Sequence, residues 1–307
     1  MRIGLMMGAS REIGNDLAGI TAFAQQAEVM GFDHAWLAHT MGVDAMTALA
    51  LTGSQTRRIR LGTAVVPTFP RHPVAMAQQA LTVAAASNGR FDLGIGLSHK
   101  MLIEDMLGIS YAHPAAHMRE YLQVLLPALR GEQVAHQGER FRVNMRIGVP
   151  GAAPPPVLVA ALGPVMLGIA GELADGTITW MTGPRTLEQH IVPTLHRAAA
   201  AAGRPAPRVV AGMPIVLTAD ADADAARSRI SESLAIYGML PSYRAMLDRE
   251  GAAAPGDIAM VGDEAALRAQ LARLRDAGVT DFDAAIVALD EGAVARTRDF
   301  LASELHP

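Results

Sequence analysis

Short apolar runs alternate with longer segments of helical periodicity along most of the chain. Apolar runs without a polar face are typical of strands that are buried on both sides in a parallel sheet. The segments between them place apolar residues on one helical face, begin at a capping aspartate or a proline, and end near glycine. The pattern predicts eight strands, at Ile3–Met7, His34–Ala38, Ile59–Val66, Phe91–Gly96, Val157–Ala161, Thr177–Trp180, Val209–Leu217 and Phe282–Leu289.

Eight strands that alternate with helices, without internal repeats, favour an α/β fold of the closed (β/α)8 or TIM-barrel type. An open, doubly wound sheet is the alternative, because alternation alone does not show closure. Two segments interrupt the alternation, at about 98–156 and 220–261. We interpret both as insertions over the C-terminal face of a single domain that spans residues 1–307. In the first insertion, the stretch from Met101 to Met118 would help to cover a substrate.

Composition and charge exclude several classes of function. Half of the 307 residues are hydrophobic, which is enough for one large domain with a substantial core. The net charge of −4 gives no reason to expect nucleic acid or an anionic membrane as a partner. The absence of cysteine excludes disulfides, thiolate nucleophiles and cysteine metal sites. Without a signal peptide at Met1–Ser10 or an uninterrupted apolar span, we expect a soluble, cytoplasmic protein.

The strongest candidate for a ligand site is the turn that follows the fifth predicted strand. It comprises Ala160, Ala161, Leu162, Gly163, Pro164 and Val165. Proline is favoured at the first position of a helix, and the glycine before it permits a sharp turn. The free N–H groups and the positive end of the helix dipole would then face a bound group, for which phosphate is the usual choice. A tight turn without a ligand is the equally weighted alternative.

In a barrel, the chemistry takes place at the C-terminal ends of the strands. That rule selects His39 and Thr40 after strand two and the segment 63–66 at the end of strand three. It also selects Ser98, His99 and Lys100 after strand four. Two histidines at neighbouring strand ends, beside a candidate phosphate turn, predict a shared pocket.

Three other motifs carry less weight. Gly94-Ile95-Gly96 lacks the third glycine of a dinucleotide fingerprint, and the segment 96–100 lacks the final glycine of a nucleophile elbow. His113 and His117 are four residues apart on a predicted helix, but no third ligand is evident. We interpret both as surface histidines and predict no metal site.

Five segments resemble the bacterial luciferase-like oxidoreductases, whose members use reduced flavin or the deazaflavin coenzyme F420. In this sequence they read Gly31–Leu37, Leu61–Pro67, Gly89–Gly96, Ala160–Pro164 and Ala174–Gly176. The resemblance implies a (β/α)8 barrel with the cofactor phosphate at the strand-five turn. It also implies that Thr63, Ala64 and Val65 lie behind the ring, often with a non-proline cis peptide, and that Leu97 and Ser98 line the cofactor site.

One departure from the family pattern affects the predicted chemistry. Many relatives carry a carboxylate followed by histidine after strand two, whereas here the aligned pair is His39-Thr40. Some deazaflavin relatives place an acidic group after strand four, where this chain has His99. Reduction of an activated double bond therefore becomes at least as plausible as alcohol oxidation. The candidate catalytic residues are His39, His99 and Thr40.

The sequence predicts an oxidoreductase that exchanges a hydride between coenzyme F420 and a small organic substrate. An FMN-dependent monooxygenase of the same family is the first alternative. A Schiff-base aldolase that uses Lys100, the only lysine, and a non-catalytic flavin-binding protein are the others. The expected partner is a small-molecule substrate, and a homodimer is compatible with the sequence.

Overall fold

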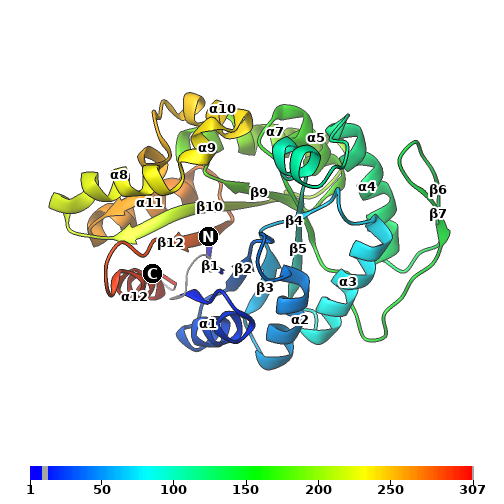
Figure 1. Cartoon of the computed structure of the whole chain (residues 1–307), viewed down its shortest axis with the longest axis horizontal. Coiled ribbons are helices and arrows are strands. Elements are labelled where there is room, and N and C mark those ends of the chain that lie inside the picture. The colour runs from blue at the N-terminus through cyan, green and yellow to red at the C-terminus, as the bar shows by residue number, and fades with distance from the viewer. Residues whose placement is uncertain (9–12, 306–307) are drawn as a thin grey trace.

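The computed structural model describes residues 1–8 and 13–305, and its parallel strands form a barrel that is surrounded by helices (Figure 1). β10 pairs with β9 on one side and β12 on the other, so the ring of strands closes. This closure confirms the predicted (β/α)8 barrel and excludes the open sheet. The barrel strands are β1 (Arg2–Met7), β2 (His34–Leu37), β3 (Arg60–Thr63), β5 (Phe91–Gly96), β8 (Val157–Ala160), β9 (Gly176–Trp180), β10 (Arg208–Leu217) and β12 (Asp281–Ile286).

The helices of the barrel begin where the sequence predicts caps. The side chains of Asp16 and Asp44 accept hydrogen bonds from N–H groups in the first turns of their helices. Pro73 and Pro164 occupy the first helical position of theirs, where proline costs no hydrogen bond. The outer helices are α1 (Leu17–Met30), α2 (Ala45–Gln55), α3 (Pro73–Ala86), α4 (Pro114–Leu129), α5 (Pro164–Leu173), α7 (Val192–Ala201), α11 (Glu264–Asp276) and α12 (Ala293–Ser303).

The segment 98–156 contains both an addition to the barrel and part of its wall. α4 packs between α3 and α5, and it thus takes the place of the regular helix that follows β5. The additions are the π-helix η2 (Met101–Met106) and the antiparallel hairpin of β6 (Val134–Gln137) and β7 (Arg142–Met145), which lies outside α4 (Figure 1). Of the stretch from Met101 to Met118, only the part before Pro114 is free to cover a ligand.

The segment 220–261 follows β10 and is mainly helical, as predicted. It ends in β11, a short strand that pairs with β10 outside the ring. Its elements are η4 (Asp220–Asp222), α8 (Ala223–Ser233), α9 (Ala235–Met239), α10 (Pro241–Glu250), η5 (Pro255–Ile258) and β11 (Met260–Gly262). Three short elements lie elsewhere in the chain, namely β4 (Val66–Pro67), α6 (Pro184–Thr186) and η3 (Leu187–Ile191). None of the helices in the described part of the chain has the length and apolar character that a bilayer crossing needs.

The upper interior of the barrel is filled by one large indole and three aliphatic side chains. Trp36 is fully buried there with Leu158, Ile178 and Val210. Gly62 is required beside it, because a Cβ at this position would lie 2.2 Å from the Trp36 ring. The imidazole of His34 stacks on the lower side of the indole, with the ring centroids 5.1 Å apart.

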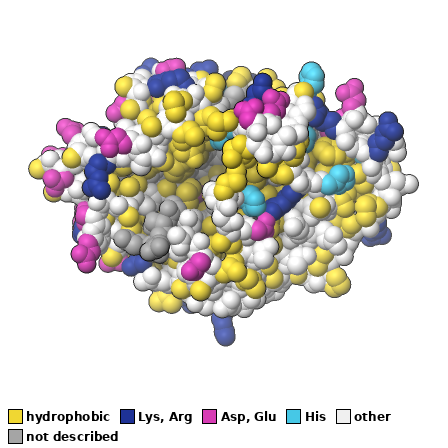
Figure 2. All heavy atoms as spheres, in the orientation of Figure 1, with side chains coloured by type: hydrophobic (Ala, Val, Ile, Leu, Met, Phe, Trp, Pro, Cys, Tyr) yellow, Lys and Arg dark blue, Asp and Glu magenta, His cyan; other side chains and the backbone are white. Residues whose placement is uncertain are grey.

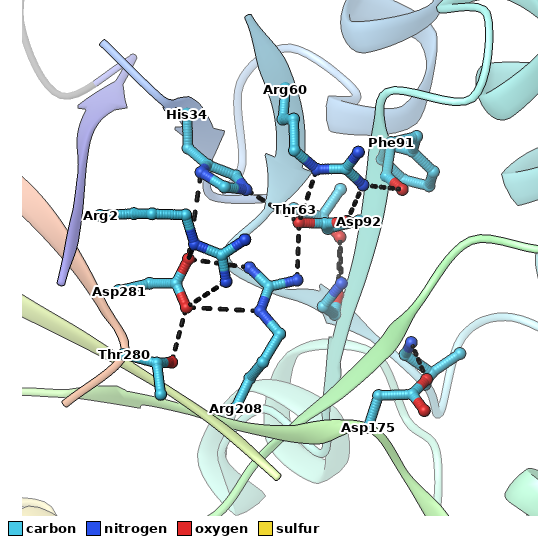
Figure 3. Close-up of polar contacts among 12 residues, drawn as sticks. Arg2, His34, Arg60, Thr63, Phe91, Asp92, Asp175, Arg208, Thr280 and Asp281 are labelled. Atoms are coloured by element: carbon cyan, nitrogen blue, oxygen red, sulfur yellow. Dashed lines mark hydrogen bonds and ion pairs between the residues drawn. The ribbon is translucent and has the colours of Figure 1, made fainter. Parts of the chain in front are cut away.

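The lower interior contains a network of charged side chains that joins six strands (Figure 3). Arg208 bridges two buried carboxylates, with Nη1 2.9 Å from Asp92 Oδ2 and Nη2 3.0 Å from Asp281 Oδ1. Asp92 also contacts Arg60 and the ring of His34, whose Nε2 is 3.0 Å away. Arg2 on β1 also pairs with Asp281, with its Nε 2.7 Å from Asp281 Oδ1. The N-terminal end of the barrel is thus closed by paired charges.

The network keeps its carboxylates ionised although they are buried. Burial disfavours the charge of Asp92, but the hydrogen bond from His34 and the charges of Arg208 and Arg60 outweigh it and hold its pKa well below the usual range. For Asp281, burial is likewise outweighed, chiefly by Arg208, and the pKa is lowered. Folding is therefore coupled to the ionisation of both groups.

We expect Asp92→Asn to lower the free energy of unfolding by about 3 kcal/mol at pH 7, because it leaves Arg60 and Arg208 without one of their buried counter-charges. Urea unfolding measures this value, and Asp224→Asn, on an exposed side chain, is the matched control. The stabilising effect of ionised Asp92 is present above its unfolded-state pKa of about 3.8 and is lost as the pH falls below that value. The difference in free energy of unfolding between the parent and Asp92→Asn should therefore become smaller in acid. A loss below about 1 kcal/mol would show that the network does not hold the barrel together.

Candidate active site

The C-terminal ends of the strands meet at the opposite end of the barrel, which we call the mouth. His39 follows β2, the segment 64–65 follows β3, His99 follows β5 and Ala160 ends β8. Figure 2 shows a hollow near the middle of one face, bordered by hydrophobic side chains. The predicted catalytic and cofactor residues therefore come from neighbouring strand ends of one closed ring.

The peptide bond between Ala64 and Val65 is cis, as the family resemblance implied. Both residues are partly exposed at the mouth and pack on the interior layer that contains Trp36. Gly96 allows this approach, since a Cβ there would lie 2.7 Å from the Val65 side chain. Ala64 and Val65 thus form a small apolar platform on which a planar ring could rest.

Thr63 has a different place from its two neighbours. It is fully buried, and its hydroxyl donates to the carbonyl oxygen of Gly94 at 2.8 Å and accepts from the Gly94 N–H at 2.9 Å. Both hydrogen bonds tie β3 to β5, so the hydroxyl is already occupied. The structure therefore gives Thr63 a role in placing the platform and not an open position at the mouth.

The turn after β8 has the geometry of an anion site. α5 begins at Pro164 with Gly163 as its N-cap, and residues 163–165 are exposed. A Cβ at Gly163 would meet no atom within 4 Å, so the space in front of the helix is open. The N–H groups of the first turn have no carbonyl partner within the helix. These features suit an anion such as phosphate, and the phosphate site stays a prediction. The ring of His190 contacts the turn, with its Nε2 2.8 Å from the Leu162 carbonyl oxygen.

The other predicted turn residues differ in exposure. Ala161 is buried, while Ala160 and Leu162 are partly exposed beside the platform. After β5, Leu97 and Ser98 are also partly exposed. Ser98 has a φ of 60°, and its carbonyl oxygen accepts a hydrogen bond from the Tyr111 hydroxyl at 3.2 Å. The chain therefore turns sharply just before His99.

His39 lies at the mouth with one ring nitrogen already engaged. The Ala45 N–H donates to Nδ1 at 3.3 Å, which leaves the proton of the neutral ring on Nε2. Burial, aided by the charge of Arg71, lowers the pKa of His39, and Asp44 only partly opposes this effect. His39 is therefore a neutral imidazole at pH 7. Its neighbour Thr40 is exposed.

His99 belongs to a wall of aromatic side chains. Its ring centroid lies 5.8 Å from that of Tyr243 on α10, which packs edge-on against Tyr237 on α9. Tyr237 in turn meets Trp180 at the end of β9, with centroids 6.1 Å apart. Burial in this wall lowers the pKa of His99 and raises that of Tyr243. The second insertion thus reaches the mouth through Tyr237 and Tyr243.

The rim of the mouth is apolar. Most of the exposed large hydrophobic side chains come from segments that follow the strand ends, namely Met41, Met101, Met106, Leu107, Val165, Ile236 and Met239. Methionine is flexible and polarisable, so such a rim can adapt to differently shaped apolar ligands. An exposed apolar set of this kind is typical of a binding surface.

One expectation is wrong, and one alternative loses support. His117 is buried and not a surface histidine: its ring stacks on Phe69 at 4.0 Å and its Nε2 lies 3.1 Å from the Thr68 hydroxyl. Lys100 is exposed, and its Nζ lies 3.5 Å from Glu104 Oε2. Water therefore stabilises the charge of its amine. This position does not suit a Schiff-base lysine, which needs a desolvated amine.

Sequence reasoning missed Trp180, Tyr237 and Tyr243. Trp180 could have been found, because it is the last residue of a predicted strand and the strand-end rule applies to it. The two tyrosines lie in an insertion without a repeating pattern, so no local signal indicated that they return to the mouth.

Comparison with known proteins identifies the family of the chain. The family model of the luciferase-like monooxygenases matches residues 1–300, and the chain belongs to that family. Its members are oxidoreductases. An uncharacterised protein of Mycobacterium tuberculosis is 31% identical over 252 residues, which cover 78% of this chain and 74% of that protein. The 5,10-methylenetetrahydromethanopterin reductase of Methanolobus tindarius is 28% identical over 233 residues, with coverages of 76% and 71%.

Two solved structures show how widely this fold is shared. The coenzyme F420-dependent tetrahydromethanopterin reductase of Methanopyrus kandleri superposes with a TM-score of 0.82 at 22% identity, over 99% of this chain and 98% of the other. The oxygenating constituent of 3,6-diketocamphane monooxygenase from Pseudomonas putida, in complex with FMN, gives a TM-score of 0.77 at 17% identity, over 100% and 98%. Both likenesses establish the barrel fold.

Gly163→Asp tests the anion site. It places a negative charge at the N-terminus of α5, and we expect cofactor affinity to fall at least tenfold while the melting temperature without cofactor changes little. Gly148→Asp adds the same charge at another exposed glycine with open space around its Cβ and should bind cofactor like the parent. If Gly163→Asp also binds like the parent in fluorescence titration, the phosphate site lies elsewhere.

Proposed function

We propose that the chain is an oxidoreductase that exchanges a hydride between coenzyme F420 and a small, uncharged organic substrate at the barrel mouth. The observation that carries this proposal is the open N-terminus of α5 beside the apolar platform of Ala64 and Val65. Together they offer a place for a phosphate after β8 and a place for a flat ring after β3, on the two sides of β5. When bound, the deazaflavin supplies the hydride chemistry, and the protein supplies orientation and the proton.

The choice of coenzyme F420 rests on relatives. The Methanolobus tindarius reductase is named for the reduction of a methylenetetrahydromethanopterin, and the solved tetrahydromethanopterin reductase is described as dependent on coenzyme F420. The diketocamphane monooxygenase binds FMN on the same fold, which supports an FMN-dependent monooxygenase as the second candidate.

The proton is assigned to His39 or His99. Both rings lie at strand ends of the mouth, and both are neutral at pH 7 because burial lowers their pKa values. A neutral imidazole can accept a proton when an alcohol is oxidised, and its N–H can direct a water when a double bond is reduced. Thr40 is exposed next to His39 and can orient a water, but a hydroxyl is no base at neutral pH.

The apolar rim supports an uncharged substrate. Methionine and leucine side chains from the segments after β2 and β5 face solvent, and the aromatic wall closes the side near β9. A charged substrate would lose hydration against these apolar side chains. We therefore assign ketones, alcohols and enones of low polarity as the substrate class.

We expect coenzyme F420 to bind at least tenfold tighter than FMN, a difference of about 1.4 kcal/mol. Equilibrium dialysis of the purified chain against each cofactor measures both dissociation constants. Equal or tighter binding of FMN would contradict the assignment and favour the monooxygenase.

We expect His39→Asn or His99→Asn to lower kcat about a hundredfold or more with nearly unchanged cofactor affinity, since asparagine retains hydrogen bonding but does not titrate. His196→Asn, on the exposed face of α7, is the control. Because both pKa values lie below 6.5, the acid limb of the parent's kcat/KM profile should also fall below pH 6.5. Normal turnover of both single variants and the double variant would show that neither histidine handles the proton.

A further inference from the structure

The carboxylate of Asp44 contacts three neighbours at the start of α2. Its Oδ1 accepts a hydrogen bond from the Thr47 N–H at 2.8 Å, which caps the helix. Its Oδ2 pairs with Arg71 Nη2 and lies 3.7 Å from His39 Nδ1. An N-cap needs only one side-chain oxygen. The second oxygen, between a guanidinium group and an imidazole, therefore indicates a role beyond capping.

His39 is held at both its backbone and its ring. Its backbone N–H donates to the Val65 carbonyl oxygen at 3.4 Å, which places it beside the apolar platform. Its Nδ1 accepts from the Ala45 N–H at 3.3 Å. The side chain is 23% exposed, and Nε2 is not one of the buried side-chain atoms that lack a partner in the described chain. Nδ1 thus faces α2, and Nε2 is the ring nitrogen left for water or a ligand.

Arg71 is firmly held in the short loop between β4 and α3. Its backbone N–H donates to the Thr68 carbonyl oxygen at 3.2 Å. Thr68 is fully buried, and it contacts β5 through Gly96 at 2.9 Å and α4 through His117 at 3.1 Å. Among residues 1–8 and 13–305, Asp44 is the only carboxylate that pairs with Arg71, whose side chain is only 17% exposed. The pair therefore fixes the start of α2 relative to the neighbouring strand end.

Asp44 and Arg71 are the charged groups of the described chain that act on the His39 ring, and they act in opposite directions. Burial opposes the charge of Asp44, but the hydrogen bond from Thr47 and the charge of Arg71 outweigh it and lower its pKa. From α4, Tyr121 faces Arg71, and burial raises the pKa of Tyr121, so this phenol stays uncharged. The ring of His39 thus lies beside one fixed anion and one fixed cation.

The contact with Ala45 determines where the ring can carry a proton. The proton of a neutral imidazole lies on the nitrogen that does not accept a hydrogen bond, which here is Nε2. A second proton would have to bind Nδ1, where it would face the Ala45 N–H. The ring would regain a partner only by turning toward Asp44 Oδ2, which already accepts from Arg71. The present contacts therefore suit the neutral ring with its proton on Nε2.

We propose that Asp44 and Arg71 are positioning residues that keep His39 Nδ1 against the start of α2 and leave the Nε2–H as a hydrogen-bond donor at the mouth. The oxygen of a carbonyl or enone substrate is an acceptor that suits a neutral N–H donor. An alcohol needs a lone pair to receive its proton, and Nε2 has none in this tautomer. This inference rests on the proposed function and assigns His39 to the reductive direction.

¹⁵N NMR of the cofactor-free protein, labelled at histidine, tests the arrangement directly. The signals that are lost in His39→Asn identify the ring. At about pH 8 we expect a pyrrole-like shift for Nε2 and a pyridine-like shift for Nδ1. The reverse assignment would overturn the proposal. Because the measurement needs neither cofactor nor substrate, its outcome is independent of the proposed function.

Two substitutions should change the protonation of His39 in opposite directions. Asp44→Asn retains an N-cap but loses the charge, so the ratio of protonated to neutral His39 at about pH 6 should fall about twofold or more. Arg71→Gln should raise the same ratio by about twofold or more, and Arg71→Lys should bring it back toward the parent value. Changes in the same direction, or no change, would contradict the assigned roles.

Two control variants separate this effect from the general loss of a cap or an ion pair. Asp263→Asn alters the N-cap of α11, which accepts from the Ala266 N–H at 2.8 Å. Arg119→Gln breaks a pair with Glu172 that joins α4 to α5. Both should leave the His39 ratio at the parent value, and a shift in either would overturn the proposal.

The pH profile of kcat/KM connects the positioning pair to turnover. With reduced coenzyme F420 and cyclohexenone, the acid limb should move to higher pH in Arg71→Gln and to lower pH in Asp44→Asn. An acid limb that neither variant moves would show that His39 is not the donor. If the NMR results are as expected but coenzyme F420 supports no turnover, the positioning of His39 stands and the cofactor assignment falls.

Discussion

The pairing of Arg208 with Asp92 and Asp281 is the interaction on which the barrel most depends. It joins strands from the first and last thirds of the chain, and the side chains of Arg2, His34 and Arg60 complete the contacts across six strands (Figure 3). Removal of one buried partner would leave an uncompensated charge, which costs far more than a surface pair yields. The network also fills the N-terminal end of the barrel interior with paired charges.

Above this charged layer, the interior is apolar and closely packed. Trp36 fills the middle because Gly62 and Gly4 leave room for its ring, and the Ala64–Val65 platform rests on it. The loops above carry flexible methionines and the aromatic wall from the second insertion. The paired charges thus join the strands at the lower end, while flexible methionine side chains at the mouth can adapt to a bound ligand.

Sequence patterns were sufficient to predict the barrel fold and the positions at which several of its helices begin. Apolar runs and helix caps are local signals, so helix starts at an aspartate or a proline could be predicted, and Asp16, Asp44 and Pro164 are examples in the structure. Contacts that depend on distant segments were not accessible in this way. The charged network draws on six strands, and Tyr243 meets His99 only because an insertion folds back over the mouth. For the same reason His117 was mistaken for a surface residue: Phe69, which buries it, lies on another element.

In the proposed function, one cofactor spans the N-terminus of α5 and the Ala64–Val65 platform. A crystal structure of the complex with coenzyme F420 tests it most directly. We expect phosphate density within hydrogen-bond distance of the first-turn N–H groups after Gly163, and the deazaflavin ring in van der Waals contact with Val65. Phosphate density at another strand end, such as the loops after β10 or β12, with no ring against Val65, would contradict the account.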